Sequence, residues 1–127
     1  MSILLRIAAI YSLAWSVGLV WSDLWPAISP AAGPEAHSLA LALAVANLAY
    51  ALLFWAAAGN PGGYRLVLYV ALLVFGLRAV IGTWEVLYTL EGGPAVARLF
   101  DMVASLALFV GILNALPGAL AAPPRPG

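Results

Sequence analysis

Four long apolar stretches run along the chain, and segments rich in proline and glycine separate them. The apolar stretches cover residues 3–24, 37–58, 64–90 and 96–116. Each reaches the roughly 20 apolar residues that a helix needs to cross a bilayer core about 30 Å thick. Proline cannot donate the hydrogen bond of a helix interior, and glycine favours helix ends. The separating segments therefore end one helix before the next begins.

This pattern predicts an all-α, transmembrane four-helix bundle with up-down-up-down topology. The apolar runs are too long for strands and lack strict alternation. The short second and third connections force the helices that they join to be antiparallel. A single transmembrane domain is expected over residues 1–116, followed by a disordered, proline-rich tail at 117–127.

Composition strengthens the membrane prediction. Of the 127 residues, 65% are hydrophobic and only 8% are charged, whereas a soluble domain has about 25% charged residues. Lipid must therefore surround most of the chain, and we expect a multi-pass protein of the inner (plasma) membrane. The net charge is zero and no lysine is present, so nucleic acid is not an expected partner. The absence of cysteine excludes disulfides and thiolate chemistry.

Arginine placement predicts the orientation of the bundle. Arg6, Arg65 and Arg125 fall on one side of the predicted membrane, whereas the acidic residues gather on the other side with Arg98. Because cytoplasmic loops retain arginine and lysine, both termini should be cytoplasmic. Aromatic residues agree with this orientation: the predicted interface anchors are Trp15, Trp21, Trp25, Trp84 and Tyr88 towards the outside and Trp55 and Tyr64 towards the inside.

Arg78 stands near the middle of the third stretch. A charge at that depth costs at least about 2.5–3.5 kcal/mol, so it must face protein, water or a counter-ion. Glu85 shares its helix face but lies about 10 Å further along the axis at 1.5 Å per residue. A direct ion pair between the two is not expected, because pairing within a helix favours a separation of three or four residues.

Polar side chains form a stripe on each of the other stretches as well. We infer that these stripes converge into an outward-opening pocket with Arg78 as its floor and carboxylates at its rim. The predicted ligand-binding residues are Arg78, Glu85, Asp101, Asn47, Asp23, Ser12 and Ser16. A structural interpretation stands beside this one: Arg78 could pair with a carboxylate to fix helix packing. Asp101 could complement a helix dipole, and the asparagine and serines could join helices.

Recognisable catalytic, metal and cofactor signatures are missing from the sequence. The single histidine, His37, belongs to no H-E-x-x-H motif and has no identifiable serine partner. No glycine-rich phosphate loop occurs, and His37 sits at the end of a span, whereas haem would need an axial histidine within one. We therefore predict no catalytic residues, no metal ligands and no cofactor.

The layout resembles the DoxX-like group of small bacterial membrane proteins with four spans. The resemblance rests on length, short loops, an arginine inside the third span (Arg78), and acidic residues at Glu85, Glu91 and Asp101. It covers the whole chain but includes no diagnostic motif. Members of that group are mostly of unknown function, and some are associated with quinone-linked respiration or redox stress. The resemblance implies a bacterial source, and no site residue is taken from it.

Three functions are compatible with these features. The favoured one is a binding or accessory subunit that holds a small amphipathic or anionic ligand, with membrane lipids and either a partner membrane protein or a second copy of the chain as partners. The second is a transporter or channel component, because charged groups at mid-membrane suit an ion path. The third is an enzyme acting on a lipid or quinone-like substrate, with Glu85 or Asp101 as acid or base.

Overall fold

The computed structural model describes residues 1–24, 34–88 and 95–125, without the side chains of 22–24, 34–37, 39–40, 85 and 95–98. Over these residues the chain is all-helical and forms four α-helices. They are α1 (Ser2–Leu24), α2 (Pro34–Gly59), α3 (Arg65–Tyr88) and α4 (Ala95–Ala121). Each is long and apolar enough to cross a membrane. The all-α fold and the membrane-spanning length of these helices are confirmed.

Two helix limits differ from the predicted ones by three residues or more. Helix α2 begins at Pro34, three residues before the predicted start, because proline at the first helical position lacks only an N–H that has no partner there anyway. Helix α4 continues past the predicted limit at Leu116 to Ala121, with Pro117 inside it. Near a helix end, the single hydrogen bond lost at proline is tolerated more easily than in mid-helix. Residues expected to begin a disordered tail thus extend the helix.

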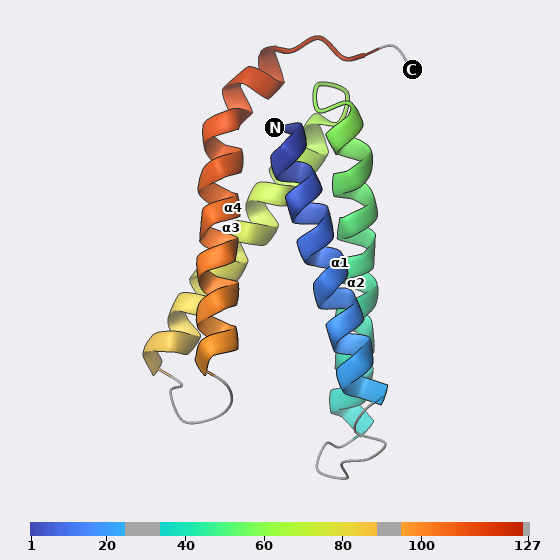
Figure 1. Ribbon diagram of the computed structural model, residues 1–127, viewed down its shortest axis with the longest axis vertical. Coiled ribbons are helices and arrows are strands. Elements are labelled where there is room, and N and C mark those ends of the chain that lie inside the picture. Colours follow the sequence, from blue (N-terminus) through green and yellow to red (C-terminus); the bar gives the residue numbers. More distant parts are fainter. Residues whose placement is uncertain (25–33, 89–94, 126–127) are drawn as a thin grey trace.

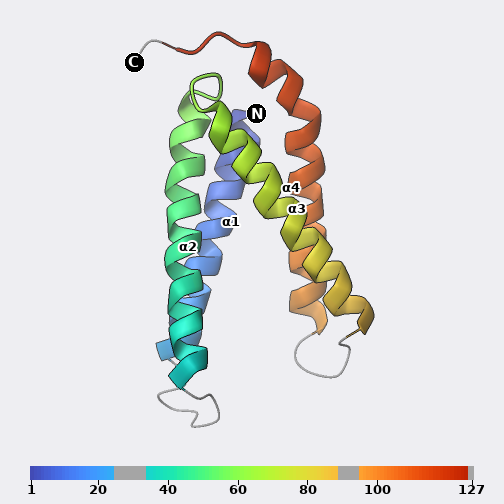
Figure 2. The ribbon, with the colours of Figure 1, turned by 180° about the vertical axis from the view of Figure 1, so that it is seen from behind.

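The helices are arranged as two hairpins. Helix α1 packs along α2, and α3 packs along α4, whereas few contacts join one hairpin to the other. Figures 1 and 2 show the hairpins converging at the end that carries the N-terminus and the α2–α3 turn, and separating towards the opposite end. The predicted bundle is therefore unevenly packed, and its open end is the one expected to face outward.

Small residues bring the helices of each hairpin close together. On α1, Ala9 and Ser12 are buried, and on α2, Ala44 and Ala51 are buried. The Ser16 hydroxyl donates a hydrogen bond of 2.7 Å to the Ala44 carbonyl across this contact. A side-chain bond to the backbone of the opposing helix requires a close approach, as expected where small residues line a membrane helix interface.

Gly82 provides the equivalent close approach in the second hairpin. A Cβ atom at this position would lie 3.0 Å from Met102 Cβ and 3.3 Å from Met102 Cα. Because α4 would have to shift, Gly82→Ala should lower the free energy of unfolding by about 1–3 kcal/mol, the usual cost of overpacking. Reversible unfolding in bicelles measures the change. Gly18→Ala is the matched control, since nothing lies within 4 Å of that position, and an equal loss in both variants would contradict this assignment.

The apolar core lies at the converging end of the hairpins. Its largest fully buried side chains are Leu5, Phe54, Leu68, Phe75 and Ile112. Large apolar side chains also cover the outside: Leu66 is 76% exposed and Val80 is 67% exposed. An apolar exterior around an alanine-rich interior is the distribution expected when lipid, not water, surrounds the helices.

A short segment after α4 fastens the two hairpins at this end. The Asn60 side chain in the α2–α3 turn donates to the Arg125 carbonyl (3.2 Å) and accepts from the Arg125 N–H (3.0 Å). At Gly62 the segment passes so closely that an added Cβ would lie 2.7 Å from the Ala122 carbonyl oxygen. Residues 122–125 therefore form a clamp from the second hairpin onto the turn, where the sequence led us to expect a disordered tail.

The clamp predicts a local effect of substitutions in the turn. Gly62→Ala should displace residues 122–125 and increase the rate of carboxypeptidase digestion several-fold, because the side chain would collide with the backbone of the clamp. The helices should keep their stability to within about 1 kcal/mol, the net worth of one or two exposed hydrogen bonds. Gly59→Ala is the control, with nothing within 4 Å. Equal digestion of the two variants would argue against the clamp.

Candidate functional site

Arg78 and Asp101 form an ion pair inside the second hairpin. Arg78 lies thirteen residues after the start of α3, about 20 Å along its axis. Its Nη2 atom is 3.4 Å from Asp101 Oδ1 on α4, and the two side chains are 20% and 21% exposed. The counter-ion of Arg78 thus comes from the neighbouring helix, and the pair carries no net charge.

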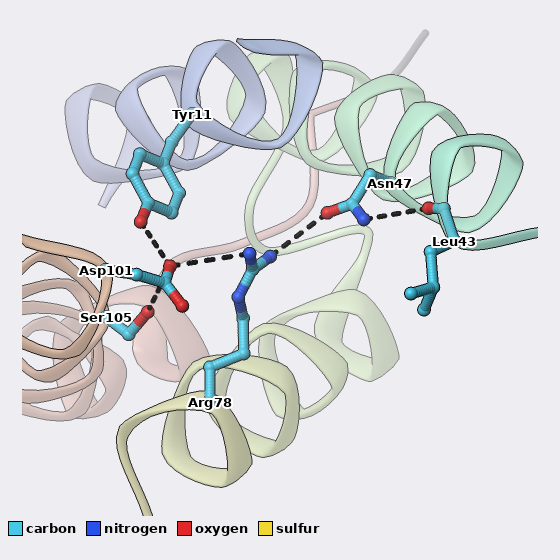
Figure 3. Close-up of polar contacts among 6 residues, drawn as sticks. All are labelled: Tyr11, Leu43, Asn47, Arg78, Asp101 and Ser105. Carbon is cyan, nitrogen blue, oxygen red and sulfur yellow. Dashed lines mark hydrogen bonds and ion pairs between the residues drawn. The ribbon is translucent and has the colours of Figure 1, made fainter. Parts of the chain in front are cut away.

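The first hairpin contributes neutral polar groups to the same cluster. Arg78 Nη1 donates a hydrogen bond of 3.0 Å to Asn47 Oδ1 on α2. The Asn47 amide nitrogen in turn donates to the Leu43 carbonyl at 2.8 Å, which orients the amide oxygen towards Arg78. Figure 3 shows Arg78 reaching from α3 between Asn47 on one side and Asp101 on the other. The guanidinium therefore bridges the two hairpins.

Among the described residues, the contacts of Asp101 all fall on a single oxygen of its carboxylate. The Tyr11 hydroxyl on α1 donates to Asp101 Oδ1, and Ser105 Oγ lies 3.5 Å from the same atom. Arg78 is bound at this oxygen as well (Figure 3). The second oxygen, Oδ2, takes no part in these contacts. The carboxylate is thus held in place by three helices and keeps one face for another donor.

Aromatic rings surround the guanidinium. Arg78 Cζ lies 5.2 Å from the centroid of the Trp15 ring and 5.6 Å from that of Tyr11, within the range of cation–π attraction. Towards the converging end, Tyr11 packs on Phe75 (6.3 Å between centroids), which packs on Phe54 (5.8 Å). These aromatic rings therefore form the edge of the apolar core that lies against the polar cluster.

A cavity of about 380 Å³ adjoins the cluster between the hairpins. Its polar end is formed by Asn47, Arg78 and Asp101, and the remaining walls are apolar or aromatic. They comprise Trp15, Leu19, Leu43, Ala46, Tyr50, Val74 and Leu77. The volume and the small number of polar groups in an apolar wall are typical of small-molecule sites.

The predicted site residues divide into three groups. Asn47, Arg78 and Asp101 come together as the polar end of the cavity. Ser12 and Ser16 are buried, but Ser16 bonds to Ala44, and Ser12 Oγ has no hydrogen-bond partner within the residues that the structure describes. Neither serine lines the cavity. The side chains of Asp23 and Glu85 lie outside the described part of the structure.

Two residues of the cluster were missed in the sequence. Tyr11 binds Asp101, and Trp15, interpreted as an interface anchor, instead lies over Arg78. The two rings pack edge to face with centroids 6.5 Å apart. Their spacing of four residues places them on one helix face, beside the serine stripe. The sequence feature that could have identified these two residues is an aromatic pair beside the polar positions Ser12 and Ser16.

Among the described residues, no group of three histidine or acidic side chains is placed to hold a metal ion. The fold and the cluster define a class: a multi-pass helical protein whose two hairpins hold a neutralised ion pair beside an apolar cavity. Comparison of the chain with protein-family models, with curated proteins and with solved structures finds no match.

Proposed function

We propose that this protein is a small membrane-embedded binding subunit that holds an amphipathic ligand in the cavity between its hairpins. The observation that carries the proposal is the position of the Arg78–Asp101 pair at one end of a cavity whose other walls are apolar. The ligand's polar group would meet the pair, and its apolar body would lie along Trp15, Leu43 and Leu77.

A purely structural role for the ion pair is the competing explanation. Arg78 is already bonded to Asn47 and paired with Asp101, as expected if the pair only fixes the packing of the helices. However, packing alone gives no reason for a cavity beside the pair, because close packing in membranes stabilises helix contacts. The guanidinium has five N–H groups, and the two contacts described leave others for a ligand.

The structure offers less support for a channel. A path through the protein from the cavity would have to cross the layer of Tyr11, Phe75 and Phe54, and both phenylalanines are fully buried. Buried aromatic rings at this level favour a site that is closed towards the converging end. An enzymatic role would need a proton donor or acceptor beside the ligand, and Asp101 is held by Tyr11 and Arg78. Ligand binding needs no further group.

We place the bundle in the inner membrane with up-down-up-down topology and both termini in the cytoplasm. Support comes from Arg6, Arg65 and Arg125, which belong to the chain ends and to the start of α3, and from Arg6 lying 5.9 Å from the Trp55 ring. A green fluorescent protein fused after Gly127 should therefore fluoresce. Alkaline phosphatase inserted after Gly93 should be active, and the opposite pattern would reverse the orientation.

The binding proposal is tested by identifying what the protein retains. The wild-type chain, extracted from its own membranes into nanodiscs without delipidation, should release one predominant small molecule in native mass spectrometry. The Arg78→Leu variant should lose it, whereas Thr83→Ala should keep it, because the Thr83 hydroxyl donates to the Ala79 carbonyl of its own helix (2.7 Å). Identical lipid adducts in wild type and Arg78→Leu would refute binding at this cluster.

A further inference from the structure

We infer that the ligand head group is uncharged and carries a hydroxyl that both accepts and donates a hydrogen bond. This inference rests on the proposed binding function and narrows its ligand from amphipathic or anionic molecules to neutral alcohols with an apolar body. The net charge of the cluster, its remaining hydrogen-bonding groups and its depth in the spans each support such a ligand.

Arg78 already has a counter-ion beside the cavity. An unpaired arginine would attract an anion, but the Asp101 carboxylate lies 3.4 Å from it. The polar end of the cavity, formed with neutral Asn47, therefore has no net charge. An anionic head group would meet Asp101 as well as Arg78, and a cationic one would meet Arg78 as well as Asp101. Neither is favoured over a neutral group.

Arg78 and Asp101 also have hydrogen-bonding groups outside the contacts described within the cluster. Arg78 contacts Asn47 through Nη1 and Asp101 through Nη2, which leaves guanidinium N–H groups as donors. The contacts of Asp101 with described residues place its Oδ1 as the acceptor, and Oδ2 is a second acceptor outside these contacts. A hydroxyl can accept from Arg78 and donate to Asp101 at the same time. An ether or ketone oxygen can satisfy only the arginine.

The depth of the polar cluster disfavours ordinary phospholipid head groups as the ligand. Arg78 lies about 20 Å from the start of α3 and about 15 Å from its end, and Asp101 lies about 9 Å from the start of α4, so the polar end of the cavity lies inside the spans, away from the helix ends. Phosphate-bearing head groups belong to the interface, and a charge carried to this depth is costly. A single hydroxyl that loses its water but gains two hydrogen bonds is much easier to accommodate.

The ligand would reach the cavity sideways from the lipid. Two of its wall residues, Leu43 on α2 and Leu77 on α3, are 46% and 52% exposed. Helices α2 and α3 meet at their turn and separate towards the other end (Figure 2). An apolar body lying between these two leucines remains in a lipid-like environment throughout, so a membrane-dissolved alcohol need not cross water.

The test uses three probes that share a ten-carbon chain: 1-decanol, decyl methyl ether and 1-decanesulfonate. The chain has five arginines and no lysine, so ¹⁵N-arginine labelling gives at most five side-chain Nε signals. The Arg78 signal is assigned by its absence in Arg78→Lys. In wild-type protein in nanodiscs, decanol should shift this signal at a membrane mole fraction at least tenfold lower than the ether or the sulfonate requires.

Asp101→Asn provides the decisive comparison, because it keeps the size of the side chain but leaves Arg78 without a counter-ion. The preference should then reverse, with the sulfonate at least tenfold more effective than decanol. Thr83→Ala should behave as wild type. If wild-type protein binds the sulfonate or the ether as well as decanol, the head-group inference is overturned while the binding proposal stands. If no probe shifts the Arg78 signal and no retained molecule is found, both fail.

Discussion

Replacing Asp101 by leucine should lower the free energy of unfolding by about 2–4 kcal/mol, and adding Arg78→Leu should recover roughly half of that loss. The single substitution leaves Arg78 charged and without its partner at mid-membrane, and it also removes the acceptor of Tyr11. The double substitution removes the unpaired charge but still leaves the Tyr11 hydroxyl without its Asp101 acceptor and the Asn47 amide oxygen without its Arg78 donor. Equilibrium unfolding by steric trapping in bicelles measures the wild type, the two single variants and the double variant, which together form a double-mutant cycle.

Thr83→Ala is the control for this cycle. Thr83 also lies on α3 and donates a side-chain hydrogen bond, but its partner is the Ala79 carbonyl of the same helix. Its removal should change stability by less than about 0.5 kcal/mol. Additive effects of the two leucine substitutions would show that Arg78 and Asp101 do not interact, and would contradict the ion pair on which the proposed site depends.

Filling the cavity should abolish ligand retention without unfolding the protein. Val74 lines the cavity from α3, and Val74→Trp would place an indole where we expect the apolar body of the ligand. Retention in native mass spectrometry should fall at least tenfold, equivalent to about 1.4 kcal/mol. The hydrogen bonds of the polar cluster, followed through the Arg78 Nε signal, should persist because the substitution does not touch them directly.

The neighbouring Leu73 supplies a matched control. It is 62% exposed on the outer surface of the same helix, so Leu73→Trp adds an indole to the lipid-facing side. Retention should remain at the wild-type level. If both tryptophan variants retain the molecule equally, the ligand lies elsewhere on the protein, and the cavity is a packing gap.

The sequence was sufficient to predict the helices but not their arrangement. Chain length and apolar content determine a membrane span, because backbone groups in lipid must be satisfied within the helix. Packing cannot be deduced in the same way, since lipid-facing and helix-facing positions are both apolar. Leu68 is fully buried and Leu66 is 76% exposed, although the residue type is identical. The separation into two hairpins therefore required the three-dimensional structure.

For the site, the cost of a mid-membrane charge predicted that Arg78 has a partner, but it could not select the partner. Counting residues from the helix ends placed Asp101 nearer the outer surface than Arg78. The structure agrees with this order, because Gly82 of α3 faces Met102 of α4, so Asp101 lies level with the part of α3 beyond Arg78. The long Arg78 side chain reaches along α3 to meet it. Tyr11 was overlooked because its role depends on contact with another helix.

The division of the polar cluster between the hairpins bears on how the protein enters the membrane during synthesis. Both charged members, Arg78 and Asp101, belong to the second hairpin, whereas the first supplies only the Tyr11 hydroxyl and the Asn47 amide. When α3 and α4 leave the translocon together, their charges already neutralise each other. The cluster thus leaves no unpaired charge in either hairpin, and contact between the hairpins adds the hydrogen bonds of Asn47 and Tyr11.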